Sequence, residues 1–115
     1  EDPNILGSME FGTKIKGSKL IVVLGHSKCG AVEGAVDNAE LGNLTQLVNQ
    51  IKPAITGDKT NREKMVEESS RNNVKLTIER ILKSSEVISA LVKDGKVKIV
   101  GAYYDLNTGK VEFMN

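Results

Sequence analysis

Residues 19–31 read Lys19-Leu20-Ile21-Val22-Val23-Leu24-Gly25-His26-Ser27-Lys28-Cys29-Gly30-Ala31. Leucine and β-branched residues fill positions 20–24 without interruption, a pattern typical of a strand buried on both faces of a parallel sheet. A turn flanked by Gly25 and Gly30 follows, and the residues from Ala31 to Val36 are predicted to form a short helix. The segment therefore predicts a strand, a turn and a helix of an α/β protein.

The turn holds the only histidine and the only cysteine of the chain, His26 and Cys29, spaced three residues apart. Imidazole and thiolate are both favoured zinc ligands, and open parallel sheets bind ligands at the carboxyl ends of their strands. We therefore predict that the pair binds a metal, with the Cys29 sulfur and a His26 ring nitrogen within about 4 Å of each other. Zinc takes four ligands, or three and a water, so the pair is an incomplete set.

Other interpretations of these residues remain open. A core cysteine beside a structural histidine is the first, and a nucleophilic Cys29 with His26 as its base is the second. The glycines at positions 25, 30 and 34 miss the G-x-G-x-x-G spacing of a nucleotide-binding loop. Residues 105–110 offer oxygen donors but are too few for a calcium loop, and they are predicted to form a hairpin turn.

Composition narrows the class of protein. The 115 residues suit one domain, and 39% hydrophobic with 27% charged residues is ordinary for a globular chain. The net charge of +1 indicates neither nucleic acid nor a membrane as a partner. No apolar run approaches the ~20 residues of a membrane span. A single cysteine excludes an internal disulfide, so we expect a cytoplasmic location, while a removed leader or an organelle targeting segment stays open.

The remaining pattern predicts more helices than strands. Asp2-Pro3 is typical of a helix start, and that helix is expected to end near Gly17. Helices are also predicted over 43–55, through a charged stretch at 59–73 into apolar positions at 74–82, and over 86–93 with Ser85 as its cap. Strands are predicted over 98–104 and 110–114. The expected fold class is α/β: a mainly parallel sheet with an antiparallel edge strand from a hairpin, and helices packed around it.

The segment from Lys19 to Ala31 resembles the second zinc motif of the β-class carbonic anhydrases. Similar flanks lie at residues 5–11, 73–74, 100–106 and 108–111, so the resemblance covers essentially the whole chain. It implies a sheet of strand order 2-1-3-4-5 whose last strand is antiparallel, and these residues would supply strands 3, 4 and 5. The family's earlier Cys-x-Asp-x-Arg motif, which supplies a second thiolate and an Asp-Arg pair, has no counterpart here.

The resemblance implies that residues 1–115 are a single domain, the carboxyl-terminal part of a β-carbonic anhydrase. The implied reaction is the reversible hydration of carbon dioxide to bicarbonate with Zn²⁺ as cofactor, which lowers the pKa of a bound water. His26 and Cys29 would be metal ligands, and Gly30 would help to shape the substrate pocket. No further catalytic residue is expected, and the isolated chain is expected to be impaired. A homodimer or higher homo-oligomer is implied; the alternative is a non-catalytic carbonic-anhydrase-like binding or assembly module.

Overall fold

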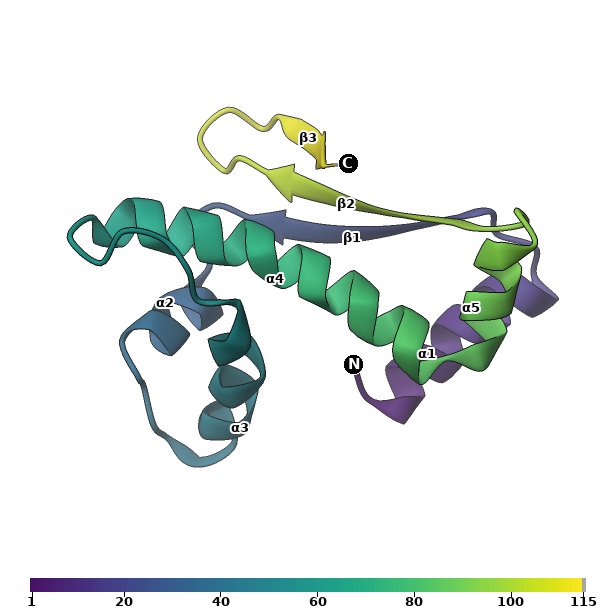
Figure 1. The fold of residues 1–115 in the computed structure, drawn as a ribbon, viewed down its shortest axis with the longest axis horizontal. Coiled ribbons are helices and arrows are strands. Elements are labelled where there is room, and N and C mark those ends of the chain that lie inside the picture. The colour runs from purple at the N-terminus through teal and green to yellow at the C-terminus, as the bar shows by residue number, and fades with distance from the viewer. Residues whose placement is uncertain (115) are drawn as a thin grey trace.

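A computed structural model describes residues 1–114 as a three-stranded sheet with all five α-helices on one side (Figure 1). β1 runs parallel to β2, and β2 pairs antiparallel with β3. This confirms the predicted α/β class and the antiparallel edge strand. Across the sheet the order is β1 (Leu20–His26), β2 (Lys98–Tyr104) and β3 (Val111–Met114).

Strand β1 extends beyond its predicted end at Leu24. The ladder with β2 continues through Gly25, opposite Tyr103, to His26, opposite Tyr104. Its run of leucine and β-branched side chains favours this extended backbone, and the β2 partner satisfies the backbone groups through His26. The backbone of His26 is therefore part of the sheet rather than of a free loop.

The first helix begins directly after a residue whose side chain caps it. The Asp2 carboxylate accepts hydrogen bonds from the N–H groups of Asn4 and Ile5, which confirms the predicted first cap. The charged and apolar stretches form one continuous helix, α4, since neither glycine nor proline interrupts them. No helix within residues 1–114 is long and apolar enough to cross a membrane. The helical elements are α1 (Pro3–Glu10), the π-helical turn η1 (Phe11–Ile15), α2 (Gly30–Val36), α3 (Gly42–Ile51), the 3-10 turn η2 (Lys52–Ala54), α4 (Arg62–Ser84) and α5 (Glu86–Lys93).

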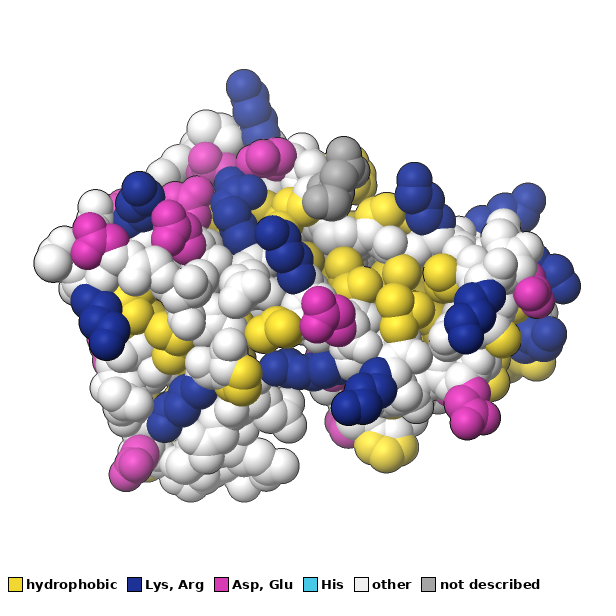
Figure 2. All heavy atoms as spheres, in the orientation of Figure 1, with side chains coloured by type: hydrophobic (Ala, Val, Ile, Leu, Met, Phe, Trp, Pro, Cys, Tyr) yellow, Lys and Arg dark blue, Asp and Glu magenta, His cyan; other side chains and the backbone are white. Residues whose placement is uncertain are grey.

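Two hydrophobic clusters hold the helices against each other and against the sheet. The first joins α2, α3 and the start of α4, with Val48 fully buried at its centre. The second joins α1, α4 and α5 through Leu6, Ile81 and Ile88, and packs beneath the sheet. Figure 2 shows hydrophobic side chains gathered between the strands and α4. The two clusters anchor opposite ends of α4, so this helix spans the length of the core.

The expectation that β1 is buried on both faces is wrong for this chain. Leu20, Val22 and Leu24 are 53%, 43% and 54% exposed, while Ile21 and Val23 between them are partly buried. The physical reason is that every helix packs on the same side of the sheet (Figure 1), which leaves the opposite side uncovered within residues 1–114. We call this side the outer apolar face; the sheet register places Leu20, Val22, Leu24, Val111 and Phe113 on it.

Ser85, which caps α5 beside the second cluster, is expected to contribute strongly to the free energy of unfolding. Its hydroxyl accepts from the Ile88 N–H at 3.1 Å and donates to Glu10 Oε1 at 2.7 Å, and the residue is 1% exposed. Ser85→Ala removes a cap and leaves buried polar groups unpaired, so we expect a loss of about 2 kcal/mol in urea-induced unfolding. The matched change Ser8→Ala, on an exposed helix surface, should change stability by less than about 0.5 kcal/mol. Equal effects of the two variants would contradict this account.

Candidate metal centre

The turn after β1 connects a strand directly to a helix. His26 is the last residue of β1, and Cys29 is the residue that immediately precedes α2. Between them Lys28 adopts a φ of +53°, a left-handed conformation that reverses the chain within a few atoms. The two predicted metal ligands therefore stand at the two ends of one tight turn. Their separation of about 4 Å remains a prediction.

His26 is held by its backbone and by its ring. Its carbonyl oxygen accepts a hydrogen bond of 3.2 Å from the hydroxyl of Ser70, a buried residue of α4. Its ring Nδ1 lies 2.9 Å from the carbonyl oxygen of Ser27. A carbonyl oxygen only accepts, so this contact favours the tautomer with hydrogen on Nδ1, in which Nε2 carries the free lone pair. This is the orientation in which a histidine binds a metal through Nε2.

Cys29 carries a thiol that the local structure does not use. The residue has extended backbone angles, φ −69° and ψ 113°, and its side chain makes no capping hydrogen bond to α2. It is partly buried and packs against the first hydrophobic cluster. The side chain thus contacts the cluster, and its sulfur remains available as a ligand. These features leave both the metal-ligand and the nucleophile interpretations of Cys29 open.

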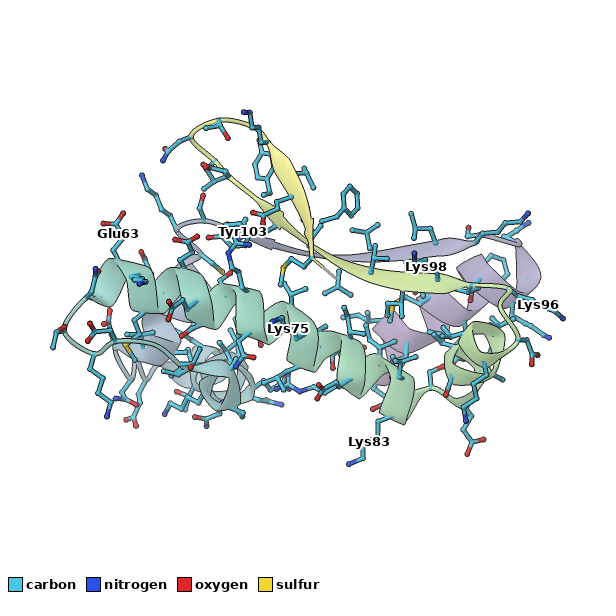
Figure 3. All side chains as sticks on the ribbon, turned by 45° about the horizontal axis from the view of Figure 1, so that its top comes forward. Glu63, Lys75, Lys83, Lys96, Lys98 and Tyr103 are labelled. Carbon is cyan, nitrogen blue, oxygen red and sulfur yellow. The ribbon has the colours of Figure 1, made fainter. Side chains whose placement is uncertain are left out.

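A charged cleft of about 410 Å³ lies beside this turn, between α2, α4 and the β2–β3 hairpin. The guanidinium of Arg71, from α4, stacks 4.1 Å from the centre of the Tyr103 ring and pairs with Glu67 and Glu112. Burial raises the pKa of Tyr103, and the carboxylates of Glu67 and Asp105 add to this while Arg71 opposes it. Figure 3 shows Tyr103 and Glu63 toward the same end of the molecule, and Lys96 at the other. The cleft is lined by Ser27, Lys28, Glu33, Arg62, Glu63, Val66, Glu67, Tyr103, Asp105 and Asn107.

One exposed ion pair closes the helix side of the cleft. Arg62, at the start of α4, donates hydrogen bonds of 3.0 and 2.6 Å to Asp37, at the end of α2. The hydrogen bond from Arg62 lowers the pKa of Asp37. Both side chains are about half exposed, so solvent screens the pair and its contribution to stability is small. The pair connects the end of α2 to the start of α4.

Gly30, predicted to shape a substrate pocket, is the first residue of α2 and is exposed. A Cβ built there would meet nothing within 4 Å, so the space beside this residue is open. Gly30 is not among the residues that line the cleft beside this turn. The role of Gly30 in substrate binding therefore stays a prediction.

The sequence interpretation missed the serines that fix the turn. Ser27 stands between the two predicted ligands, and Ser70 lies 44 residues beyond His26. A serine does not contribute to the hydrophobic periodicity from which helices and strands are predicted. The groups that its hydroxyl contacts are decided by the tertiary fold. Of the two serines, only Ser27 has a local sequence signal, because it lies between the two predicted ligands.

Comparison with known proteins identifies the family to which the chain belongs. Residues 1–111 match the model of the carbonic anhydrase family. The chain belongs to that family. Among the relatives of this carbonic anhydrase chain, carbonic anhydrase 2 of Mycobacterium tuberculosis is 31% identical over 114 residues, which make up 95% of this chain and 55% of the relative. The chain thus spans about half the length of the curated relatives it matches.

Solved structures show that the fold is that of the β-class carbonic anhydrases. A β-carbonic anhydrase of Aspergillus fumigatus superposes with a TM-score of 0.89 at 22% identity, covering 99% of this chain and 57% of that one. A tetrameric β-carbonic anhydrase of Sordaria macrospora gives a TM-score of 0.85 at 21% identity, covering 99% of this chain and 61% of that one. The likeness extends over the whole described structure.

Zinc, the metal that the β-carbonic anhydrase fold implies, suits the donors of this turn. The free Nε2 of His26 and the unengaged thiol of Cys29 are a nitrogen and a sulfur donor of the kinds that zinc prefers. Residues 1–114 contain no group of three or more His, Cys, Asp and Glu side chains arranged to hold a metal. The turn therefore fits as one part of a zinc site, which would need further ligands from outside residues 1–114.

Proposed function

We propose that this chain forms part of a zinc-dependent carbonic anhydrase that hydrates carbon dioxide reversibly to bicarbonate, with His26 and Cys29 as two of the zinc ligands. The observation that carries the proposal is the hydrogen bond from His26 Nδ1 to the Ser27 carbonyl, because it leaves Nε2 free to bind a metal. Membership of the carbonic anhydrase family supports the reaction.

Each residue of the turn has a separate task in this proposal. His26 donates Nε2 and Cys29 donates its sulfur as a thiolate, the form in which cysteine binds metals. When bound, zinc supplies Lewis acidity that makes water a nucleophile at neutral pH. Gly30 leaves room beside the ligands for a small apolar substrate, since it adds no side chain at the start of α2. The Ser27 carbonyl and the Ser70 hydroxyl keep the histidine in position.

The zinc ligands that residues 1–114 do not supply would have to come from outside these residues, for example from partners of the chain. Two donors bind zinc weakly, so the chain by itself is proposed to be a poor catalyst whose site is completed by residues outside 1–114. A homo-oligomer is proposed as the functional form, and the tetrameric relative from Sordaria macrospora supports it. A cytoplasmic location belongs to the same proposal, since a free cysteine is typical of a reducing compartment.

Cobalt binding tests the ligand assignment directly. Since Cys29 is the only cysteine, a thiolate-to-Co²⁺ charge-transfer band in the near ultraviolet reports this residue alone. We expect the band in the unaltered chain and its loss in Cys29→Ser, with weaker Co²⁺ binding in His26→Ala. Lys28→Asn is the matched control, because asparagine tolerates the left-handed backbone at this position. Equal Co²⁺ spectra for the unaltered chain and Cys29→Ser would contradict the proposal.

Stopped-flow hydration of carbon dioxide with added Zn²⁺ tests the expectation that the isolated chain is a poor catalyst. For the isolated chain we expect little activity above that of free zinc. Full activity that disappears in Cys29→Ser would show that copies of this chain complete one another's sites, contrary to the expectation of a poor catalyst. The binding-module alternative is retained because residues 1–114 contain no group of three side chains arranged to hold a metal.

A further inference from the structure

Ser27 connects the metal-binding turn to the hairpin that follows β2. Its hydroxyl accepts a hydrogen bond of 2.9 Å from the backbone N–H of Leu106, 79 residues further along the chain. Its own N–H donates to the Tyr104 carbonyl at 2.9 Å, and its carbonyl accepts from His26 Nδ1 at 2.9 Å. We propose that Ser27 is a positioning residue that sets the ring orientation of His26 by fixing the turn to the β2–β3 hairpin.

The hydrogen bonds of Ser27 restrain both its backbone and its side chain. The bond to Tyr104 extends the β1–β2 ladder past the last strand residue, and the bond from Leu106 holds the side chain against the hairpin. These two bonds hold the residue against the end of β2 and the hairpin turn, and the carbonyl that orients the His26 ring belongs to the same residue. Lys28, which follows with a positive φ, contributes no such restraint because its side chain is exposed.

The hairpin that receives Ser27 is closed by hydrogen bonds of its own. The Asp105 N–H donates to the Lys110 carbonyl, and the Gly109 N–H donates to the Asp105 carbonyl at 2.8 Å. The Asp105 carboxylate also accepts from the Asn107 N–H at 2.8 Å. Leu106, whose side chain is 50% exposed, thus presents its N–H from a closed turn. A rigid donor is what a positioning hydrogen bond requires.

The proposal rests on the proposed function, since it concerns a histidine that binds metal. A partner that orients a metal-binding histidine typically changes metal affinity by about 10–100-fold when it is removed. Because the Ser27–Leu106 bond is exposed to solvent, we expect the low end of this range. A role in stability alone would leave the orientation of His26 unchanged, and this difference makes the proposal testable.

The experiment removes the bond from each side and reads two independent signals. Ser27→Ala removes the acceptor, and Ser27→Thr keeps it. Leu106→Pro removes the donor, and Leu106→Ala keeps it. The first signal is the ¹⁵N spectrum of the imidazole in the metal-free protein, which reports the tautomer of the only histidine. The second is the apparent Co²⁺ dissociation constant from chelator competition, and circular dichroism checks that each variant is folded.

We expect a single tautomer with hydrogen on Nδ1 in the unaltered chain, a mixture in Ser27→Ala and Leu106→Pro, and recovery in Ser27→Thr and Leu106→Ala. Co²⁺ binding should weaken about tenfold in the first pair and recover in the second. Should the unaltered chain bind no Co²⁺, the proposed function fails, and the tautomer comparison still decides the role of Ser27. A folded Ser27→Ala chain with an unchanged tautomer overturns the proposal.

Discussion

Gly101→Ala is expected to destabilise the protein by about 2–3 kcal/mol in urea-induced unfolding. A Cβ at this position in β2 would lie 2.8 Å from Val74 Cγ1, and one at Gly25 in β1 would lie 2.7 Å from Val74 Cγ2. The two methyl groups of Val74 thus occupy hollows that the two glycines leave in adjacent strands. Valine is restricted to one strongly preferred rotamer in a helix, so rotation of its side chain does not readily relieve this contact. Helix α4 would therefore have to move away from the sheet.

A second substitution tests this explanation. Val74→Ala removes the methyl groups that collide, so Gly101→Ala should cost less in that background, with a coupling energy of about 1 kcal/mol or more. The control is Gly7→Ala in α1, where a Cβ meets nothing within 4 Å and the change should stabilise the helix by about 0.5–1 kcal/mol. If Gly101→Ala unfolds at the urea concentration of the unaltered protein, the close approach of α4 is not as described.

The features that sequence predicts well are those whose cause is local. Asp2 and Ser85 cap helices because their own side chains reach the next turn, and both positions were predicted. The unbroken run in β1 predicted a strand for the same reason. Its exposure was predicted wrongly, because burial depends on which side of the sheet the helices occupy, and the side chains of β1 carry no information about that.

The residues of the candidate site also divide into those that the sequence predicts locally and those that depend on the tertiary fold. His26 and Cys29 were found because they are adjacent in sequence and unique in type. Ser27 and Ser70 were missed because their partners lie 79 and 44 residues away, and only the packing of α4 and the hairpin against β1 brings them together. Tyr103, beside the cleft, was predicted only as part of a strand, since its contact with Arg71 joins β2 to α4.

The outer apolar face has consequences for assembly. Leu24 and Phe113 are 54% and 62% exposed, and the register places both of them beside Ala102. Strand β1 has no pairing partner on its other edge within residues 1–114. An apolar sheet face that ends in an unpaired edge favours association with another chain. Charged residues, which commonly protect such edges, are absent from the stretch between Leu20 and Leu24.

We therefore expect the chain to self-associate, and the double variant Val22→Lys, Leu24→Lys to be monomeric. Burying a half-exposed aliphatic side chain is worth about 1 kcal/mol, and each change counts twice in a symmetric pair, so association should weaken roughly 1000-fold. Sedimentation velocity over a concentration series measures this against the monomer mass of 12.4 kDa. Leu41→Lys is the matched control, because Leu41 is 73% exposed and lies in the connection before α3, away from the sheet. An unaltered chain that stays monomeric at high concentration would contradict this prediction, because the outer apolar face would then remain exposed to solvent.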